Sequence, residues 1–314
     1  MISGKNSGTW KNSGNIERHS EASQLIIIIL TGSSYIPYAE AAGHSGIAPG
    51  DLVVMSADLT RMAMLALRKE GDFDVRIFIE GFQDFLGPEG TLVIPSFNFN
   101  LRNNDPYSRI HTLPITGSLA QAVLKWTDFQ RTSNPLHSFL AWGKHAGDLV
   151  RLDNKSSFGP GSPFAFFRER HAVMLLAGIH IRSAFTFVHH VEEMEQVRYR
   201  KMKKIRIFLE DEKKHGDFLL FAKKPGWTME MSGLETLLLE QSVAQQVSIN
   251  NLTFTKVDLA AAYPLIRNDI RNNRSAAIAR FSPKLYFRDM AKNILARLGV
   301  YTVADKISHD PGIL

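Results

Sequence analysis

Short apolar runs alternate with amphipathic stretches in the middle of this chain, and this alternation constrains its fold more than any other feature. The segment "LVVMS" at 52–56 is an uninterrupted apolar run, typical of a strand buried on both faces. In "FDVRIFIEGFQDFL" the apolar residues recur on one face of a helix, and "TLVIPSF" at 91–97 is a second apolar run. A strand, a helix and a strand in this order predict a βαβ unit with parallel strands.

The same pattern continues after this unit. "TGSLAQAVLKW" predicts another helix, "AVMLLAGI" a third core strand, and "PKLYFRDMAKNILARLG" a basic amphipathic helix near the end of the chain. "KIRIFL" and "FLLFA" flank the turn-like "DEKKHGD" and predict an antiparallel hairpin. "SGLETLLLEQ" has the pattern of a capping box between Ser232 and Glu235. We therefore expect an α/β fold, with a central mixed sheet flanked by helices and an antiparallel hairpin in the C-terminal half.

The two ends of the chain differ from its middle. The first residues are polar and rich in Gly, Ser and Asn, as disordered segments are, and "LIIIIL" follows at 25–30. This run is too short for a membrane span, which needs about 20 residues, or for the apolar region of a signal peptide, which has about 7–15. We expect an N-terminal extension over 1–45, a catalytic domain over 46–280 and a basic helical extension over 281–314, in a cytoplasmic protein.

Composition limits the chemistry and the partners. The chain has no cysteine, which excludes disulfides, thiolate metal ligands and a cysteine nucleophile. Its net charge of +6 favours anionic partners such as phosphates and nucleotides. The basic run "RYRKMKKIR" lacks the interleaved aromatic residues of a nucleic-acid surface, so no nucleic-acid partner is expected. The C-terminal basic helix leaves a membrane-surface interpretation open, but membrane association is not the expectation.

The stretch "TFVHHVEEMEQ" concentrates residue types that suit acid–base chemistry. On a helix, Thr186, His189 and Glu192 share one face, and Glu193 lies one turn from His189. Histidine titrates close to neutral pH, which suits His189 as a general base, and either glutamate could orient its ring. A solvated helix face is the plainer interpretation. A metal site that uses His190 is not expected, because the HExxH pattern is absent and adjacent histidines point apart on a helix.

Several motifs between about residues 47 and 200 follow the order and spacing of a known family. They include "GPEGTLVIPSF", "NPLHSFLAWG", "FGPGSPF" and the final Thr-x-x-His-x-x-Glu pattern. In this series the chain resembles the aminoglycoside 3-N-acetyltransferases, whose superfamily also contains N-acyltransferases for the amino sugars of nucleotide-sugar pathways. It departs from the family pattern at Ala57 and Asp58, where a serine-leucine pair is usual. The first 45 residues and the stretch after about Phe281 have no counterpart.

The resemblance implies transfer of an acyl group from acetyl-CoA or another acyl-CoA to a sugar amine, without a metal. We expect His189 as the base, Glu192 as its orienting partner and His137 as a further catalytic residue. Beside the coenzyme we expect Ser56, Ala57, Asp58 and Ser138. At the acceptor we expect Thr186, Glu193, Gly161 and Ser162, the last as the N-cap of a helix whose backbone amides face the substrate. A plain turn explains "FGPGSPF" equally well, and a structural histidine explains His137.

Without cysteine, direct attack of the amine on the thioester is favoured. The positive net charge favours an anionic acceptor, and we expect a nucleotide-linked amino sugar used for a surface polysaccharide. The alternative within the family is an aminoglycoside N-acetyltransferase. The alternatives of other classes are a metal-dependent hydrolase and a nucleic-acid-binding or membrane-binding protein. The sequence leaves open whether the chain forms a homo-oligomer.

Overall fold

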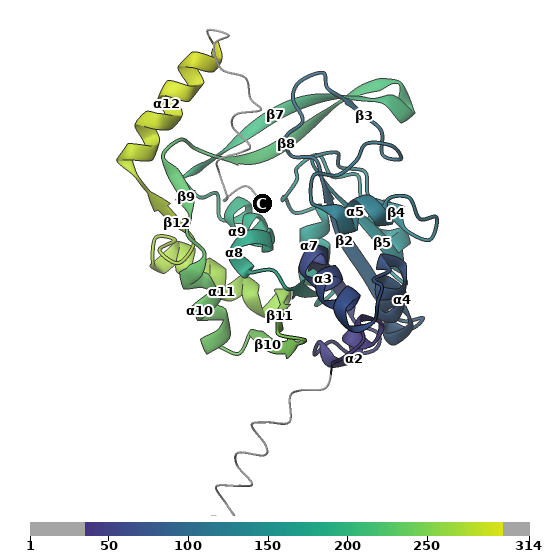
Figure 1. Cartoon of the computed structure of the whole chain (residues 1–314). Helices are drawn as coiled ribbons and strands as arrows, with labels where there is room; N and C mark the ends of the chain where they lie inside the picture. The colour runs from purple at the N-terminus through teal and green to yellow at the C-terminus, as the bar shows by residue number, and fades with distance from the viewer. Residues whose placement is uncertain (1–34, 298–314) are drawn as a thin grey trace, which may run out of the picture. The chain divides into compact units, whose positions relative to one another are not determined.

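A computed structural model describes residues 35–297, and its main feature is a mixed sheet with helices on both faces (Figure 1). The strand order is β10-β11-β6-β1-β2-β5-β4. The strands are β1 (Leu52–Ala57), β2 (Thr91–Phe97), β4 (Gln130–Arg131), β5 (His137–Gly143), β6 (Val173–Ala177), β10 (Ala244–Ile249) and β11 (Leu252–Asp258). β1 pairs in parallel with both β2 and β6, and the outer pairs are antiparallel. The predicted α/β class and the predicted parallel βαβ unit are confirmed.

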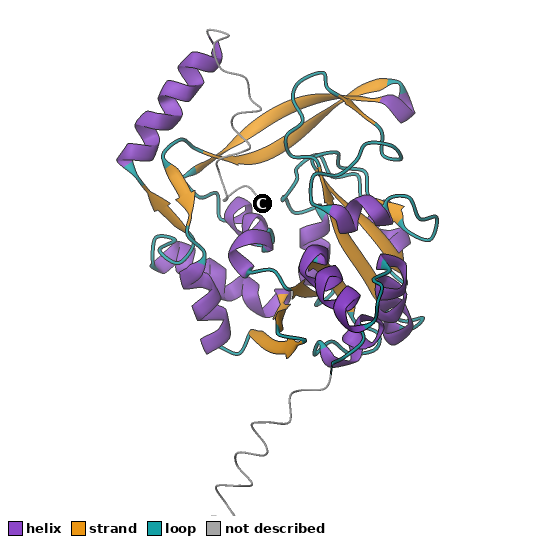
Figure 2. Ribbon diagram, viewed as in Figure 1, coloured by secondary structure: helices purple, strands orange, loops and turns teal. Residues whose placement is uncertain are grey.

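Helices cover the two faces of this sheet, as the purple ribbons in Figure 2 show. The helices within residues 35–297 are η1 (Tyr38–Glu40), α2 (Ala41–His44), α3 (Leu59–Lys69), α4 (Val75–Leu86), α5 (Ser118–Val123), α6 (Ala146–Val150), α7 (Pro163–Glu169), α8 (Ile181–Ala184), α9 (Val188–Met194), η2 (Glu210–Glu212), α10 (Ser232–Glu240), α11 (Leu259–Asn272) and α12 (Pro283–Arg297). Two of them, η2 and α12, lie away from the large sheet (Figure 1). In β1, Leu52 and Val54 belong to a core cluster that also contains side chains of α7, α9 and α11. The alternate residues Val53 and Met55 are also buried, so both faces of β1 are packed.

A second sheet is built on the predicted hairpin. β7 (Arg200–Leu209) pairs antiparallel with β8 (Lys214–Lys223), and β3 (Pro106–Tyr107) adds in parallel to β7. Its small core contains Ile205 and Ile207, packed with Tyr107, Leu136 and Phe218. The hairpin prediction is confirmed, although both strands are longer than expected. A further pair, β9 (Trp227–Met229) with β12 (Ala279–Phe281), is antiparallel.

Some local predictions are wrong. From its Asn, Pro and Ser, the sequence "RTSNPLHSFLAWG" predicts a loop after a strand, but most of this segment is β5, which pairs with β2 along its whole length. The predicted helix around the two histidines is present as α9 but begins only at Val188, after Thr186, and the basic run that follows it belongs to β7. The capping box does not form, because Ser232 is already inside α10 and its hydroxyl donates to Glu230.

The N-terminal run "LIIIIL" lies outside the described residues. The packed body begins before residue 46, because η1 and α2 both pack against α4. Within residues 35–297, no helix is both long enough and apolar enough to span a bilayer.

Candidate active site

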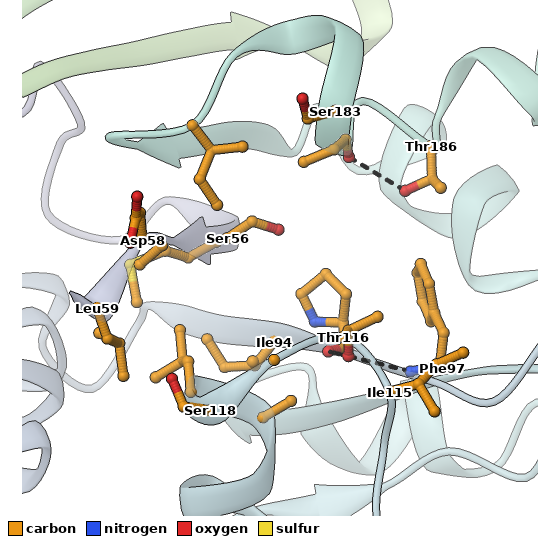
Figure 3. Close-up of a pocket in the computed structure, with 18 of the residues that line it drawn as sticks. Ser56, Asp58, Leu59, Ile94, Phe97, Ile115, Thr116, Ser118, Ser183 and Thr186 are labelled. Atoms are coloured by element: carbon orange, nitrogen blue, oxygen red, sulfur yellow. Dashed lines mark hydrogen bonds between the residues drawn. The ribbon is translucent and has the colours of Figure 1, made fainter. Parts of the chain in front are cut away.

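The main candidate site is a cavity of about 490 Å³ at the carboxyl ends of the parallel strands (Figure 3). β1 contributes Ser56 and Ala57, and β2 contributes Ile94 and Phe97. In open α/β sheets, ligands commonly bind at the carboxyl ends of the strands, at the point where the chain connections after two neighbouring strands run in opposite directions. The lining is mostly apolar with scattered hydroxyl groups, a composition that suits an elongated organic ligand.

Asp58 lies at the rim of this cavity, directly after β1. Its carboxylate accepts hydrogen bonds from the backbone N–H groups of Thr60 and Arg61 and thereby caps α3. This N-cap explains why an acidic residue follows the strand: it satisfies amides that would otherwise lack an acceptor. The structure therefore gives Asp58 a structural role at the cavity, along with the predicted place beside Ser56 and Ala57.

Thr186 connects the cavity to helix α9. It lines the cavity (Figure 3), and its carbonyl oxygen accepts the backbone N–H of His189 at 3.0 Å. Thr186 itself precedes α9 rather than lying within it. This hydrogen-bonded turn nevertheless places His189 next to Thr186, just outside the lining of the cavity, as the i, i+3 spacing predicts.

His189 and Glu192 form a close pair on α9. Nδ1 of His189 is 2.7 Å from Oε2 of Glu192. The side chain of His189 is 17% exposed, whereas that of Glu192 is fully buried at 0%. A carboxylate can only accept, so in this pair Nδ1 carries the hydrogen and Nε2 keeps its lone pair. An imidazole held in this way can accept a proton at Nε2.

The surroundings shift the pKa values of both groups. Burial lowers the pKa of His189, the positive charge of Arg200 lowers it further, and Glu192 offsets part of the effect. Burial alone would raise the pKa of Glu192, but Arg200, His189 and Tyr199 together bring it below its ordinary value. Glu192 is therefore ionised and His189 neutral at neutral pH, the protonation states of a carboxylate–histidine base.

The sequence left open which glutamate orients the histidine, and the geometry selects Glu192. Glu193 points the other way, and its Oε1 accepts a hydrogen bond from the hydroxyl of Ser156 at 2.5 Å. Burial raises the pKa of Glu193. Glu193 does not line the cavity, and its contact with an acceptor stays a prediction.

His137 lies in an aromatic cluster between the cavity and His189. Its ring is 4.8 Å from that of Phe97 and 4.5 Å from that of Phe158, and Phe158 is 5.3 Å from the ring of His189. Burial and the nearby charges of His189 and Arg200 hold the pKa of His137 well below its usual value. His137 is therefore a neutral, buried group whose ring packs against Phe158, which in turn packs against His189.

Two other predicted site residues, Ser138 and Ser162, have structural partners. The hydroxyl of Ser138 donates to the Ser96 carbonyl at 2.6 Å and accepts from Arg131 Nε at 2.9 Å, so it is not directed into the cavity. Ser162 is the N-cap of α7, as predicted, with Pro163 in the first turn. Gly161 is exposed beside it, and neither Gly161 nor Ser162 lines the cavity.

Two residues next to Glu192 were missed by the sequence interpretation. The hydroxyl of Tyr199 donates to Glu192 Oε1 at 2.8 Å, and Nε of Arg200 lies 2.5 Å from Glu192 Oε2. Arg200 was grouped with the solvated basic run, and only its 6% exposure in the fold distinguishes it from the neighbouring lysines. The one available signal was its position as the first residue of a strand directly after the His/Glu helix.

No group of three or more His, Cys, Asp or Glu side chains in residues 35–297 is arranged to hold a metal ion. His190, the residue that a metal site would need, faces the interior and its Nδ1 contacts the Phe158 carbonyl oxygen at 2.7 Å. The two adjacent histidines therefore point apart, as expected for neighbours on a helix.

Comparison with known proteins identifies a protein family that this chain matches. The model of a family described as aminoglycoside 3-N-acetyltransferase matches residues 64–268, which is more than half of the chain.

Solved structures share the fold at low sequence identity. A structure described as AAC-IIIb with CoASH has a TM-score of 0.64 and 19% identity, over 76% of this chain and 98% of that one. A histidine-to-alanine mutant of aminoglycoside acetyltransferase AAC(3)-IVa in complex with apramycin has a TM-score of 0.62 and 18% identity, over 78% and 96%. The YokD protein from Bacillus subtilis has a TM-score of 0.60 and 19% identity, over 75% and 98%.

Proposed function

The chain belongs to the aminoglycoside 3-N-acetyltransferase family, and on this basis we propose that it transfers an acyl group from a coenzyme A thioester to an amine of a sugar-containing acceptor. The family makes the protein an acyl-CoA-dependent N-acetyltransferase. The observation that carries the proposed mechanism is the His189–Glu192 pair, 2.7 Å apart, one turn beyond a cavity at the sheet edge.

In the proposed reaction, Nε2 of His189 removes a proton from the acceptor amine as its nitrogen attacks the thioester carbonyl. The new C–N bond gives a tetrahedral intermediate, and the C–S bond then breaks to release the thiolate of coenzyme A. The proton on His189 passes to that thiolate, which regenerates the neutral imidazole. Glu192 stabilises the transient imidazolium and keeps the hydrogen on Nδ1, so the lone pair stays on Nε2.

The cavity is the proposed site for the acyl-CoA arm. Its volume of about 490 Å³ and apolar lining suit an extended pantetheine chain, and the hydroxyl groups of Ser56 and Thr186 offer hydrogen bonds to its amides. Thr186 lies between this cavity and His189, so a thioester carbonyl near Thr186 would be within reach of an amine held by the base. His137 would contribute by packing, because it is buried between Phe97 and Phe158.

We propose an aminoglycoside as the acceptor class, because the family model and the related enzymes point to it more directly than to a nucleotide-linked amino sugar. The nucleotide-linked acceptor is the second candidate, and charge favours it. The chain carries a net charge of +6, and Lys223 on β8 adds a positive charge that acts on His189. A polycationic acceptor gains from acidic surroundings, whereas a pyrophosphate gains from basic ones.

Thiol release tests the function and distinguishes the two acceptors. The protein would be mixed with acetyl-CoA and either an aminoglycoside or an amino-sugar nucleotide, at equal concentration and low salt, with an acceptor-free reaction as control. We expect faster release with the aminoglycoside. Faster release with the nucleotide would establish the second candidate, and release no faster than the acceptor-free control for every amine would reject the acyltransferase function.

A further inference from the structure

Arg200 is the first residue of a basic run, yet its side chain is directed into the protein. Its side chain is 6% exposed, while Lys201 and Lys203 beside it are exposed. Its Nη1 donates to the carbonyl oxygen of Phe221 on the paired strand at 2.9 Å. The hairpin thus anchors one end of the guanidinium, and a buried cation in this position needs a nearby negative charge.

That negative charge is Glu192. Nε of Arg200 lies 2.5 Å from Oε2 of Glu192, and the hydroxyl of Tyr199 donates to the other carboxylate oxygen at 2.8 Å. His189 occupies the remaining approach to Oε2 at 2.7 Å. Both oxygens are engaged and the side chain is fully buried, so these contacts hold the carboxylate against the histidine.

Arg200 also approaches the histidine itself. Its Nη2 is 2.8 Å from Nδ1 of His189, the same nitrogen that faces Glu192, and 3.5 Å from Sδ of Met229. Nδ1 cannot both donate to the carboxylate and accept from the guanidinium. If it accepted, its lone pair would face an ionised oxygen at 2.7 Å, and Nε2 would carry the hydrogen and could not act as a base. The guanidinium has a second acceptor in Met229, so the tautomer with hydrogen on Nδ1 is the favourable one.

We propose that Arg200 is a positioning residue for acyl transfer: its guanidinium, anchored on the hairpin, fixes Glu192 against His189, so that the hydrogen stays on Nδ1 and Nε2 can accept a proton. This inference rests on the proposed role of His189 as the base. Arg200 acts through the other two residues and does not need to touch a substrate.

The charges around His189 determine how the pH profile responds. Glu192 faces it from its own helix, Arg200 from β7 and Lys223 from β8, and the buried His137 lies beyond Phe158. Burial lowers the pKa of His189 and Arg200 lowers it further, with Glu192 in opposition. The base must be unprotonated to work, so activity is lost as the pH falls through this pKa. Removing the charge of Arg200 therefore moves the acid limb of kcat/KM to higher pH.

Three substitutions separate the effects. Arg200→Gln removes the positive charge and the planar guanidinium that holds Glu192. We expect kcat to fall roughly 10–100-fold, because the catalytic pair loses its alignment, and the acid limb to shift to higher pH. Arg200→Lys keeps the positive charge but replaces the planar guanidinium with an ammonium group, so kcat should fall while the acid limb stays near that of the wild type. Lys203→Gln is the matched control, because it removes an exposed cation from the same strand, and it should change neither. The affinity for coenzyme A should be unchanged in all three.

Tyr199→Phe keeps the proposal testable if Arg200→Gln does not fold, which circular dichroism would reveal. It removes only the hydroxyl that holds Glu192, and we expect a lower kcat with unchanged coenzyme A affinity. Wild-type turnover in both Arg200→Lys and Tyr199→Phe would overturn the proposal, as would equal acid-limb shifts in Arg200→Gln and Lys203→Gln. If His189→Ala is inactive and the Arg200 variants are normal, this inference alone fails. If His189→Ala is fully active, the assignment of the base has failed first.

Discussion

His190 follows the proposed base in the chain but has an entirely different environment. Its ring packs 5.7 Å from that of Phe187 and 5.8 Å from that of Tyr263, and within the described residues its Nε2 has no hydrogen-bond partner. Burial lowers the pKa of His190 to about 4. A histidine that stays neutral in the folded protein but can take up a proton when unfolded makes stability depend on pH.

The sign of this dependence follows from the two pKa values. An unfolded histidine titrates near pH 6.5, and the folded one near 4. Between these pH values only the unfolded chain binds the extra proton. The free energy of unfolding therefore has its full value above about pH 6.5 and decreases as the pH falls toward 4. The loss from this one group is about 3 kcal/mol. Urea unfolding of the wild type and of His190→Gln at several pH values would measure it, and the variant should have a shallower pH slope. Equal slopes would show that His190 is not the responsible group.

At single positions, the sequence was most informative where spacing alone defines a neighbour. The i, i+3 relation paired His189 with Glu192, and the pair is present at 2.7 Å. Spacing along the sequence could not predict the contact between Arg200 and Glu192, because it joins helix α9 to β7, a strand of the smaller sheet. Ser138 was placed beside the coenzyme by family analogy, and the fold instead uses its hydroxyl to join two strands and Arg131.

At the scale of elements, apolar periodicity predicted the buried strands and helices well, but it predicted the secondary structure of polar segments poorly. β1, α4 and β2 coincide with their predicted stretches. The Asn, Pro and Ser residues before β5 are typical of a loop, and its strand character comes from pairing with β2, which no local sequence pattern contains. β7 begins with a basic run whose side chains are mostly exposed, so only its inward-facing Ile205 and Ile207 carry a strand signal.

The contact between η1 and α4 gives a stability test at this scale. A Cβ at Gly81 in α4 would lie 2.0 Å from the carbonyl oxygen of Ala39, so the two backbones are too close for a side chain. We expect Gly81→Ala to lower the free energy of unfolding by about 1–3 kcal/mol, the usual cost of overpacking. Gly43→Ala in α2 is the control, because its Cβ would make an ordinary contact at 3.6 Å with Phe85. If the two variants are equally stable, the close approach of η1 to α4 is incorrect.

For the whole molecule, the order of motifs predicted more than any single motif. The resemblance noted over about residues 47–200 agrees with a family match over 64–268 and with the shared fold of solved acetyltransferases. The nucleotide-linked acceptor was inferred from a net charge of +6, but net charge sums over the entire surface. Selectivity depends on the few groups that face the acceptor, and Arg200 is buried and paired with Glu192. Charge counting therefore cannot choose the acceptor.

The most direct test of the central claim is the rate of acyl transfer from acetyl-CoA by His189→Ala, measured beside its coenzyme A affinity and its circular dichroism. Loss of the general base should reduce kcat by roughly 10²–10⁴-fold, with folding and coenzyme A affinity retained because His189 lies beyond the cavity lining. A folded variant that binds coenzyme A and transfers the acyl group at close to the wild-type rate would contradict the assignment of His189 as the base.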